Sequence, residues 1–146
     1  DYNKAMEILK EKGAEILAKK SADRTAEEGR VETYTHFSSR IGAIVEVNCE
    51  TDFVAKDETF GKFVKDLVMH IAAVGPKYVN EEDVPAELLA GKNDQEKKEL
   101  LNELVLMRQP FVKNPKQSIT DMLNEVGGKF REKIVIKKFA RYSIGG

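Results

Sequence analysis

Apolar residues recur along the chain with two periods, which separate expected strands from expected helices. Residues 41–49 alternate apolar and polar positions, the period of a strand with one buried face. Residues 31–37 precede this run across a three-residue connection, so the two runs predict a β-hairpin. Residues 133–144 are rich in Ile, Val, Phe and Tyr and predict a distant third strand. The alternating apolar positions of the second run are Ile41, Ala43, Val45, Val47 and Cys49.

Helical spacing is clearest over residues 57–74, where Gly75 and Pro76 then end the pattern. Further helices are predicted at 94–107 and at 118–126. Ser118 is a candidate N-cap of the last of these, and Gly127-Gly128 are expected to end it. Residues 78–94 are expected to form a loop. The apolar stripe of the first helix consists of Phe60, Phe63, Val64, Leu67, Val68 and Ile71.

The order of these elements predicts an α+β fold with a three-stranded antiparallel sheet and flanking helices. Residues 1–12 and 14–20 also show helical spacing, and a charged stretch follows them. Because Asp1 already lies within a helical pattern, we expect the start of the chain to be the end of a longer helical module. The predicted domains are therefore 1–29, a helical remnant with its connector, and 30–146, the core.

Composition narrows the function classes. The chain of 146 residues has 24 basic and 25 acidic side chains and a net charge of -1. This balance disfavours direct nucleic-acid binding. One cysteine, Cys49, excludes an internal disulfide or a multi-cysteine metal site, and it is interpreted as a small core residue. No apolar run approaches the roughly 20 residues of a membrane span. No catalytic triad, metal cluster or cofactor loop is visible, so no catalytic residue, metal or cofactor is predicted.

Residues 50–57 connect the strand at 41–49 to the strongest helix, so they are expected to form a loop or turn. Phe53 in this segment has two interpretations. In the first, it packs into the local core while Asp52 or Asp57 caps the following helix. In the second, it is exposed for contact with a partner. The residues of the segment alone favour the first interpretation.

Several segments resemble the elongation factor Ts family. The stretch VEVNCETDFVAK, residues 45–56, is similar to the family's signature. RTAEEG at 24–29, MHIAA at 69–73, QPFV at 109–112 and the final strand at 133–145 are also similar, in family order. The resemblance runs from about Lys12 to the C-terminus, and it implies a UBA-like helical module at the N-terminus followed by the dimerisation core.

The resemblance also implies a function. Family members bind elongation factor Tu and promote GDP release by intruding on its GTPase domain near the magnesium ion. That role carries over to Thr51, Asp52, Phe53 and Val54, and a secondary contact is implied for His70 with Met69. The implied protein is an exchange factor and not an enzyme, and it acts in the bacterial cytoplasm or the matrix of a bacterium-derived organelle.

Other interpretations remain open for some of these residues. From its position at the edge of the apolar stripe alone, His70 is interpreted as a partly buried histidine with one satisfied ring nitrogen. The basic residues Lys137, Lys138 and Arg141, beside Phe139 and Tyr142, could bind RNA. Alternating charges on an exposed sheet are the commoner explanation of such a cluster.

The chain also departs from the family pattern. It carries the Asp-Phe segment and the histidine on a single core half, as short members do, so a homodimer through the sheet is expected. Ala140 stands where one kind of short member has a cysteine, which makes this dimer non-covalent. The segment at residues 91–103 is shorter than the segment that forms a pair of mid-chain helices in the family.

Overall fold

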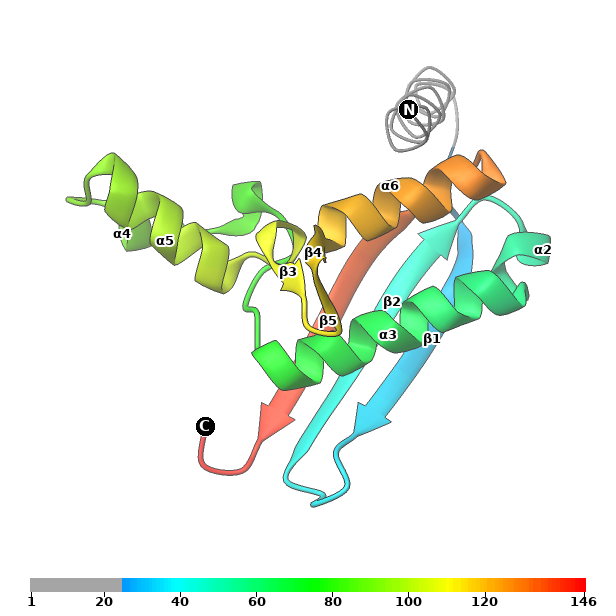
Figure 1. Ribbon diagram of the computed structural model, residues 1–146, viewed down its shortest axis with the longest axis horizontal. Coiled ribbons are helices and arrows are strands. Elements are labelled where there is room, and N and C mark those ends of the chain that lie inside the picture. The colour runs from blue at the N-terminus through cyan, green and yellow to red at the C-terminus, as the bar shows by residue number, and fades with distance from the viewer. Residues whose placement is uncertain (1–24) are drawn as a thin grey trace.

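The computed structural model describes residues 25–146, so the predicted helical module at 1–24 lies outside the described residues. The described chain is an α+β fold, as predicted (Figure 1). Its strands are β1 (Glu28–Thr35), β2 (Ile41–Cys49), β3 (Pro110–Phe111), β4 (Asn114–Ser118) and β5 (Val135–Ser143). Its helices are α2 (Asp52–Ala55), α3 (Glu58–Val74), α4 (Ala86–Leu89), α5 (Asp94–Leu104) and α6 (Ile119–Phe130), with short 3-10 turns η1 (Glu81–Asp83) and η2 (Leu106–Arg108).

The main sheet has the order β1-β2-β5, and both pairings are antiparallel. The predicted hairpin and closing strand are thus confirmed. Helices α3 and α6 lie over one face of this sheet, while α4 and α5 extend to one side (Figure 1). The alternating residues of β2 from Ala43 to Cys49 point into this covered face and are buried.

Helix α3 begins and ends as its sequence dictates. The Asp57 carboxylate accepts hydrogen bonds from the backbone N–H groups of Thr59 and Phe60, which satisfies two otherwise unpaired donors of the first turn. Gly75 follows in the left-handed conformation at φ 74°, which ends the helix at little steric cost. The predicted apolar stripe of α3 is buried along its full length against the sheet.

The ends of two predicted helices need correction. Helix α6 continues through Gly127-Gly128 to Phe130, because its apolar face packs on the core and offsets the cost of roughly 1 kcal/mol for each glycine. The helix at 94–107 ends at Leu104, where Val105 leaves it to form a β-bridge with Tyr78. Residues 50–57, expected to form a loop or turn, contain the single helical turn α2.

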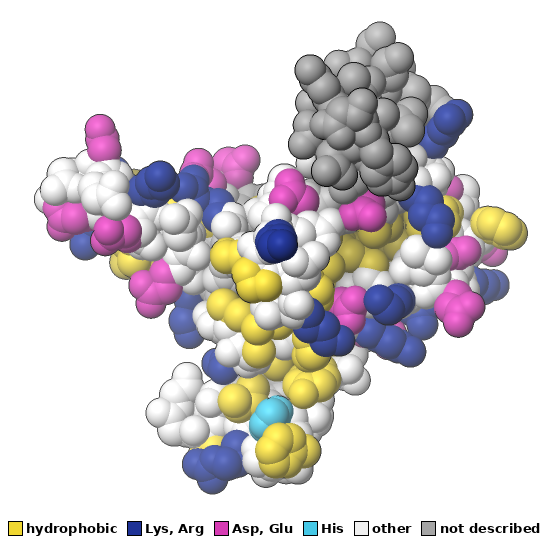
Figure 2. Space-filling view, in the orientation of Figure 1, with side chains coloured by type: hydrophobic (Ala, Val, Ile, Leu, Met, Phe, Trp, Pro, Cys, Tyr) yellow, Lys and Arg dark blue, Asp and Glu magenta, His cyan; other side chains and the backbone are white. Residues whose placement is uncertain are grey.

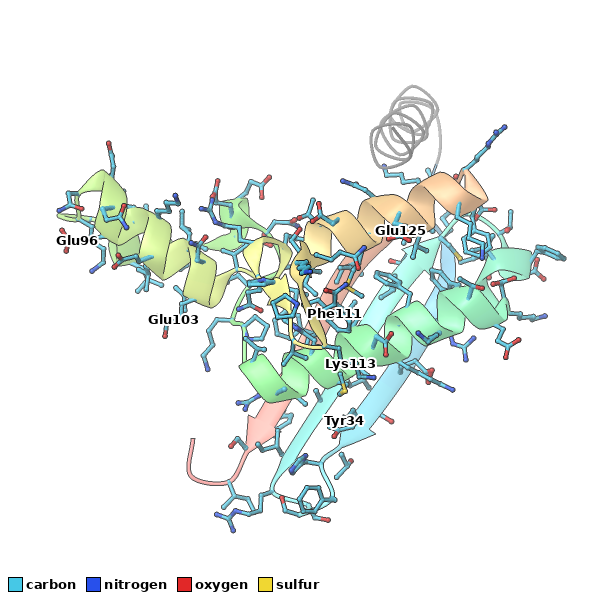
Figure 3. The ribbon with its side chains drawn as sticks, viewed as in Figure 1. Tyr34, Glu96, Glu103, Phe111, Lys113 and Glu125 are labelled. Atoms are coloured by element: carbon cyan, nitrogen blue, oxygen red, sulfur yellow. The ribbon has the colours of Figure 1, made fainter. Side chains whose placement is uncertain are left out.

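Two segments contain short elements that were not predicted. Strands β3 and β4 form a small hairpin that lies across α3, and Phe111 from it packs into the core (Figure 3). The segment 78–94, expected to be a loop, contains η1 and α4. None of these elements is longer than five residues, so no hydrophobic pattern distinguished them from a loop.

Candidate functional site

The turn α2 presents Phe53 to solvent at the end of β2. Its phenyl side chain is 79% exposed, whereas the next two residues, Val54 and Ala55, are buried beneath it. Asp52 is also exposed and lies 3.8 Å from the Lys56 ammonium, an ion pair between neighbouring turns of the chain. The core interpretation of Phe53 is therefore wrong for this chain. The exposed phenyl ring leaves apolar area in water that a partner could cover with a gain in free energy.

Local hydrogen bonds fix the position of this turn. The Thr51 hydroxyl accepts the Val54 N–H at 3.3 Å and so caps α2. From the other side, the Arg30 guanidinium donates to the Ala55 carbonyl at 3.2 Å. Gly61 on α3 leaves the space that Arg30 occupies, since a Cβ there would lie 2.8 Å from the guanidinium. The end of the turn at Ala55 is therefore tied to β1 of the sheet.

A carboxylate from the far end of the sequence also holds this turn. Glu132, which follows α6, accepts hydrogen bonds from the N–H groups of Glu50 and Thr51 and from the Thr51 hydroxyl. The Glu50 carboxylate in turn accepts the Lys133 N–H. Sequence reasoning missed Glu132, because a charged residue before a strand reads as an exposed one and 81 positions separate it from Thr51.

His70 lies in the core and is fully buried. The Val112 N–H donates to its Nδ1 at 3.2 Å, so the ring proton is on Nε2, which donates to the Gln109 Oε1 at 2.9 Å. The Phe111 ring lies 6.0 Å away, centroid to centroid. Both ring nitrogens are thus satisfied within the chain. The buried-histidine interpretation describes this geometry, while a contact with a partner stays a prediction.

Met69 precedes His70 but points to another side of α3, into a groove of about 440 Å³. Tyr34 and Lys113 lie at this groove on neighbouring elements, β1 and the β3–β4 turn (Figure 3). Next to it, the tip of the β1–β2 hairpin carries His36 and an almost fully exposed Phe37, whose ring centroids lie 4.3 Å apart at a tilted angle. Hydrophobic side chains gather around this tip in the space-filling view (Figure 2). Met69 is thus the accessible member of the Met69–His70 pair.

The basic residues of β5 do not share one face. Lys138 pairs with Glu46 across the sheet, whereas Arg141 pairs with Ala43 on the covered face. The Arg141 guanidinium donates to the Ala72 carbonyl on α3 at 3.0 Å. A phosphate backbone would need these cations on a single surface. The split arrangement disfavours the RNA-binding alternative.

Cys49 is fully buried, as predicted for a core residue. Burial and the nearby Glu132 raise the pKa of its thiol to about 11. The thiol donates a hydrogen bond to the Thr51 carbonyl. A thiol with such a pKa is protonated and a poor nucleophile at neutral pH. Residues 25–146 contain no cluster of three or more His, Cys, Asp or Glu side chains that could hold a metal ion. No helix in the same range is long and apolar enough to cross a membrane.

Stability is expected to fall on acidification below about pH 6.5 because of His70. Burial lowers the pKa of His70 below its usual 6.5, and its hydrogen bond to Gln109 only partly opposes that shift. Between the two pKa values the unfolded chain binds a proton that the folded chain excludes. The free energy of unfolding therefore decreases as the pH falls through this window, and the contribution of neutral His70 is complete above it. Urea unfolding from pH 7.5 to 5 measures this slope. The His70→Gln variant should show a shallower slope, and an equal slope in both proteins would contradict the assignment.

Comparison with known proteins places this arrangement in a family. The family model described as Elongation factor TS matches residues 3–102, which include α2, α3 and the segments that carry Phe53 and His70. The chain belongs to the elongation factor Ts family. It is 43% identical to elongation factor Ts of Caldanaerobacter subterraneus subsp. tengcongensis, an alignment that covers 99% of this chain and 82% of that protein.

Other elongation factor Ts proteins give the same result. Identity is 42% to the proteins of Carboxydothermus hydrogenoformans and Herpetosiphon aurantiacus, with 99% of this chain aligned in each case and 76% and 83% of those proteins. Each alignment spans 166 positions, whereas the chain has 146 residues, so at least 20 aligned positions have no residue here. Membership assigns the chain to translation elongation in protein biosynthesis.

Proposed function

We propose that the chain is a guanine-nucleotide exchange factor that binds elongation factor Tu with GDP and promotes GDP release. The observation that carries this proposal is the exposure of Phe53 on a turn whose entry is held by Glu132 and whose end is held by Arg30. An anchored aromatic keeps its apolar area for a partner and loses little conformational entropy on binding. Family membership supports the GTPase domain of elongation factor Tu as that partner.

In the proposed mechanism, Phe53 inserts into the GTPase domain and Asp52 follows it toward the magnesium and phosphate-binding site. Magnesium and backbone N–H groups offset the negative charge of bound GDP. A phenyl ring that displaces the segments holding these groups removes part of that offset, and GDP affinity falls. Thr51 and Val54 support the turn: Thr51, which is exposed, caps α2 with its hydroxyl, and Val54 is buried beneath Phe53.

A secondary contact is proposed at Met69, with His70 as its buried support. Met69 lies twelve positions after Asp57, the N-cap of α3 that follows α2. At about 1.5 Å per residue, Met69 is therefore roughly 18 Å along the helix from the end of α3 that is next to α2. A single domain can cover that span, because typical interfaces bury about 800 Å² on each partner. His70 uses both ring nitrogens internally, and it would act by fixing α3 against residues 109–112.

The exchange proceeds through binding alone, so no covalent chemistry, cofactor or metal of its own is assigned to the chain. By linkage, whatever factor the chain takes from the affinity of elongation factor Tu for GDP, GDP takes from the affinity for the chain. The bacterial cytoplasm is the proposed location, because the relatives named above are bacterial. Binding affinities test the proposal. Elongation factor Tu is titrated with the chain in the presence and in the absence of saturating GDP, and the complex between the two proteins should be weaker when GDP is present. Equal affinities would overturn it.

A homodimer through the outer face of the sheet is proposed as well. This face carries exposed Val31 and Ile44 beside Ala140, and apolar residues on an uncovered sheet favour association. Cys49 is buried and is the chain's only cysteine, so the dimer is non-covalent. Sedimentation velocity should show a dimer that Ile44→Asp converts to monomer. A monomeric unsubstituted chain at micromolar concentration would contradict this proposal.

A further inference from the structure

We infer that Glu132 is a positioning residue that holds Phe53 in place for exchange. The inference rests on the proposed function of α2, and it adds a residue that lies outside the signature segment. Glu132 does not approach a partner itself, since its side chain is buried. It acts through the backbone of residues 50 and 51, which carries α2.

Glu132 binds the entry to α2 with both carboxylate oxygens. Its Oε1 accepts the N–H groups of Glu50 and Thr51 at 3.0 and 3.2 Å. Its Oε2 accepts the Thr51 hydroxyl at 2.7 Å, and the same hydroxyl oxygen accepts the Val54 N–H. Charged acceptors make the stronger hydrogen bonds. A continuous set of bonds therefore runs from Glu132 through Thr51 to the residue after Phe53.

The residues on either side of Glu132 support its contact with the entry to α2. Arg131 takes the left-handed conformation at φ 53°, which is uncommon outside glycine, and this turns the chain from α6 toward β2. The Glu50 carboxylate returns a bond to the Lys133 N–H, so the strand end and the segment after α6 hold each other reciprocally. Residues 49–51 and 131–133 thus form one polar junction, here called the 50/132 junction.

The energetics favour a role of the 50/132 junction in positioning α2. A single helical turn is unstable on its own, because nucleation orders several residues for one hydrogen bond. Phe53 adds no burial that could hold α2 in place, and only Val54 and Ala55 of the turn are buried. Among the described residues, Glu132 is the only carboxylate that is buried. Burying a carboxylate is costly unless donors satisfy it, and here three donors from the entry to α2 do so.

The chain offers a direct probe of this role. It contains no tryptophan, so Phe53→Trp places a single reporter on α2. Steady-state anisotropy of the introduced indole should fall when Glu132→Ala is added, and also with Thr51→Val, which lacks the hydroxyl. It should fall less with Glu132→Gln, which keeps one carbonyl oxygen. Glu125→Ala is the matched control, because Glu125 is an exposed carboxylate on α6 that bonds to Gln117 (Figure 3). Equal anisotropy in Glu132→Ala and Glu125→Ala would overturn the inference.

Exchange is then measured on the Phe53 background with folded variants, checked by circular dichroism. The ratio of maximal GDP release rate to half-saturating concentration should fall roughly three- to tenfold in Glu132→Ala, because a freed turn must be ordered on binding. Glu132→Gln should restore part of it, and Glu125→Ala should leave it unchanged. If Glu132→Ala does not fold, Thr51→Val carries the test. The indole anisotropy could be lowered by Glu132→Ala in a chain that does not accelerate GDP release even with Glu132 in place. That result would support the positioning role of Glu132 and reject the proposed function. An unchanged ratio in folded Glu132→Ala would reject the role of Glu132 in exchange.

Discussion

Phe53→Ala is expected to reduce the acceleration of GDP release from elongation factor Tu by about ten- to a hundredfold. Burial of one Phe side chain is worth roughly 1.5–3 kcal/mol, and each 1.36 kcal/mol is about tenfold in rate. The thermal midpoint of unfolding should not change, since the side chain is 79% exposed and supports little of the fold. Stopped-flow release of a fluorescent GDP analogue, together with thermal unfolding, measures both effects.

Leu88→Ala is the control for this substitution. Leu88 is an exposed apolar residue on α4, at the side of the fold away from α2 (Figure 1). Its loss should leave both the release rate and the thermal midpoint unchanged. A Phe53→Ala variant that releases GDP as fast as the unsubstituted chain would remove Phe53 from the mechanism. A lowered thermal midpoint in Phe53→Ala would show instead that Phe53 belongs to the core.

His70→Ala is expected to lower the free energy of unfolding by about 2–5 kcal/mol. The substitution leaves a cavity at a fully buried position and removes the partners of the Gln109 carbonyl oxygen and the Val112 N–H. Such a loss is a large part of the roughly 5–15 kcal/mol that stabilises a typical domain. Urea unfolding at pH 7.5, followed by circular dichroism, gives the value directly.

His36→Ala is the matched control, because His36 is the only other histidine of the chain. It lies at the hairpin tip. Its Nδ1 is 3.4 Å from the Tyr34 hydroxyl, and its ring makes a tilted contact with the ring of exposed Phe37. Its loss should change the free energy of unfolding by about 0.5 kcal/mol or less. A similar small effect for His70→Ala would mean that the His70 hydrogen bonds do not stabilise the fold. Any effect of His70→Ala on GDP release must therefore be measured on the folded fraction.

The sequence predicts the long elements of this fold well. Strand β2 matches the predicted residues 41–49, and α3 differs by one residue, because a long element with one buried face leaves a full periodic pattern. The end of α6 was wrong because local helix-breaking at Gly127-Gly128 competes with packing of Leu123, Val126 and Phe130 on the core. Tertiary packing prevailed there, and no local pattern shows it.

The candidate site was predictable only in part. The resemblance of residues 45–56 indicated Phe53, although the residues alone favoured its burial. It gave no indication that His70 is buried with both ring nitrogens satisfied. The partners of His70 lie 39 and 42 positions away, and Glu132 lies 81 positions from Thr51. Contacts at such separations depend on how the elements pack, and a single sequence does not encode them as a pattern.

The most direct test of the proposed exchange function is the rate at which elongation factor Tu releases fluorescent GDP, with and without this chain. Release should accelerate with increasing chain concentration, approach a plateau, and lose most of this acceleration in the Phe53→Ala variant. A folded chain that leaves the release rate unchanged at every concentration would contradict the proposed function.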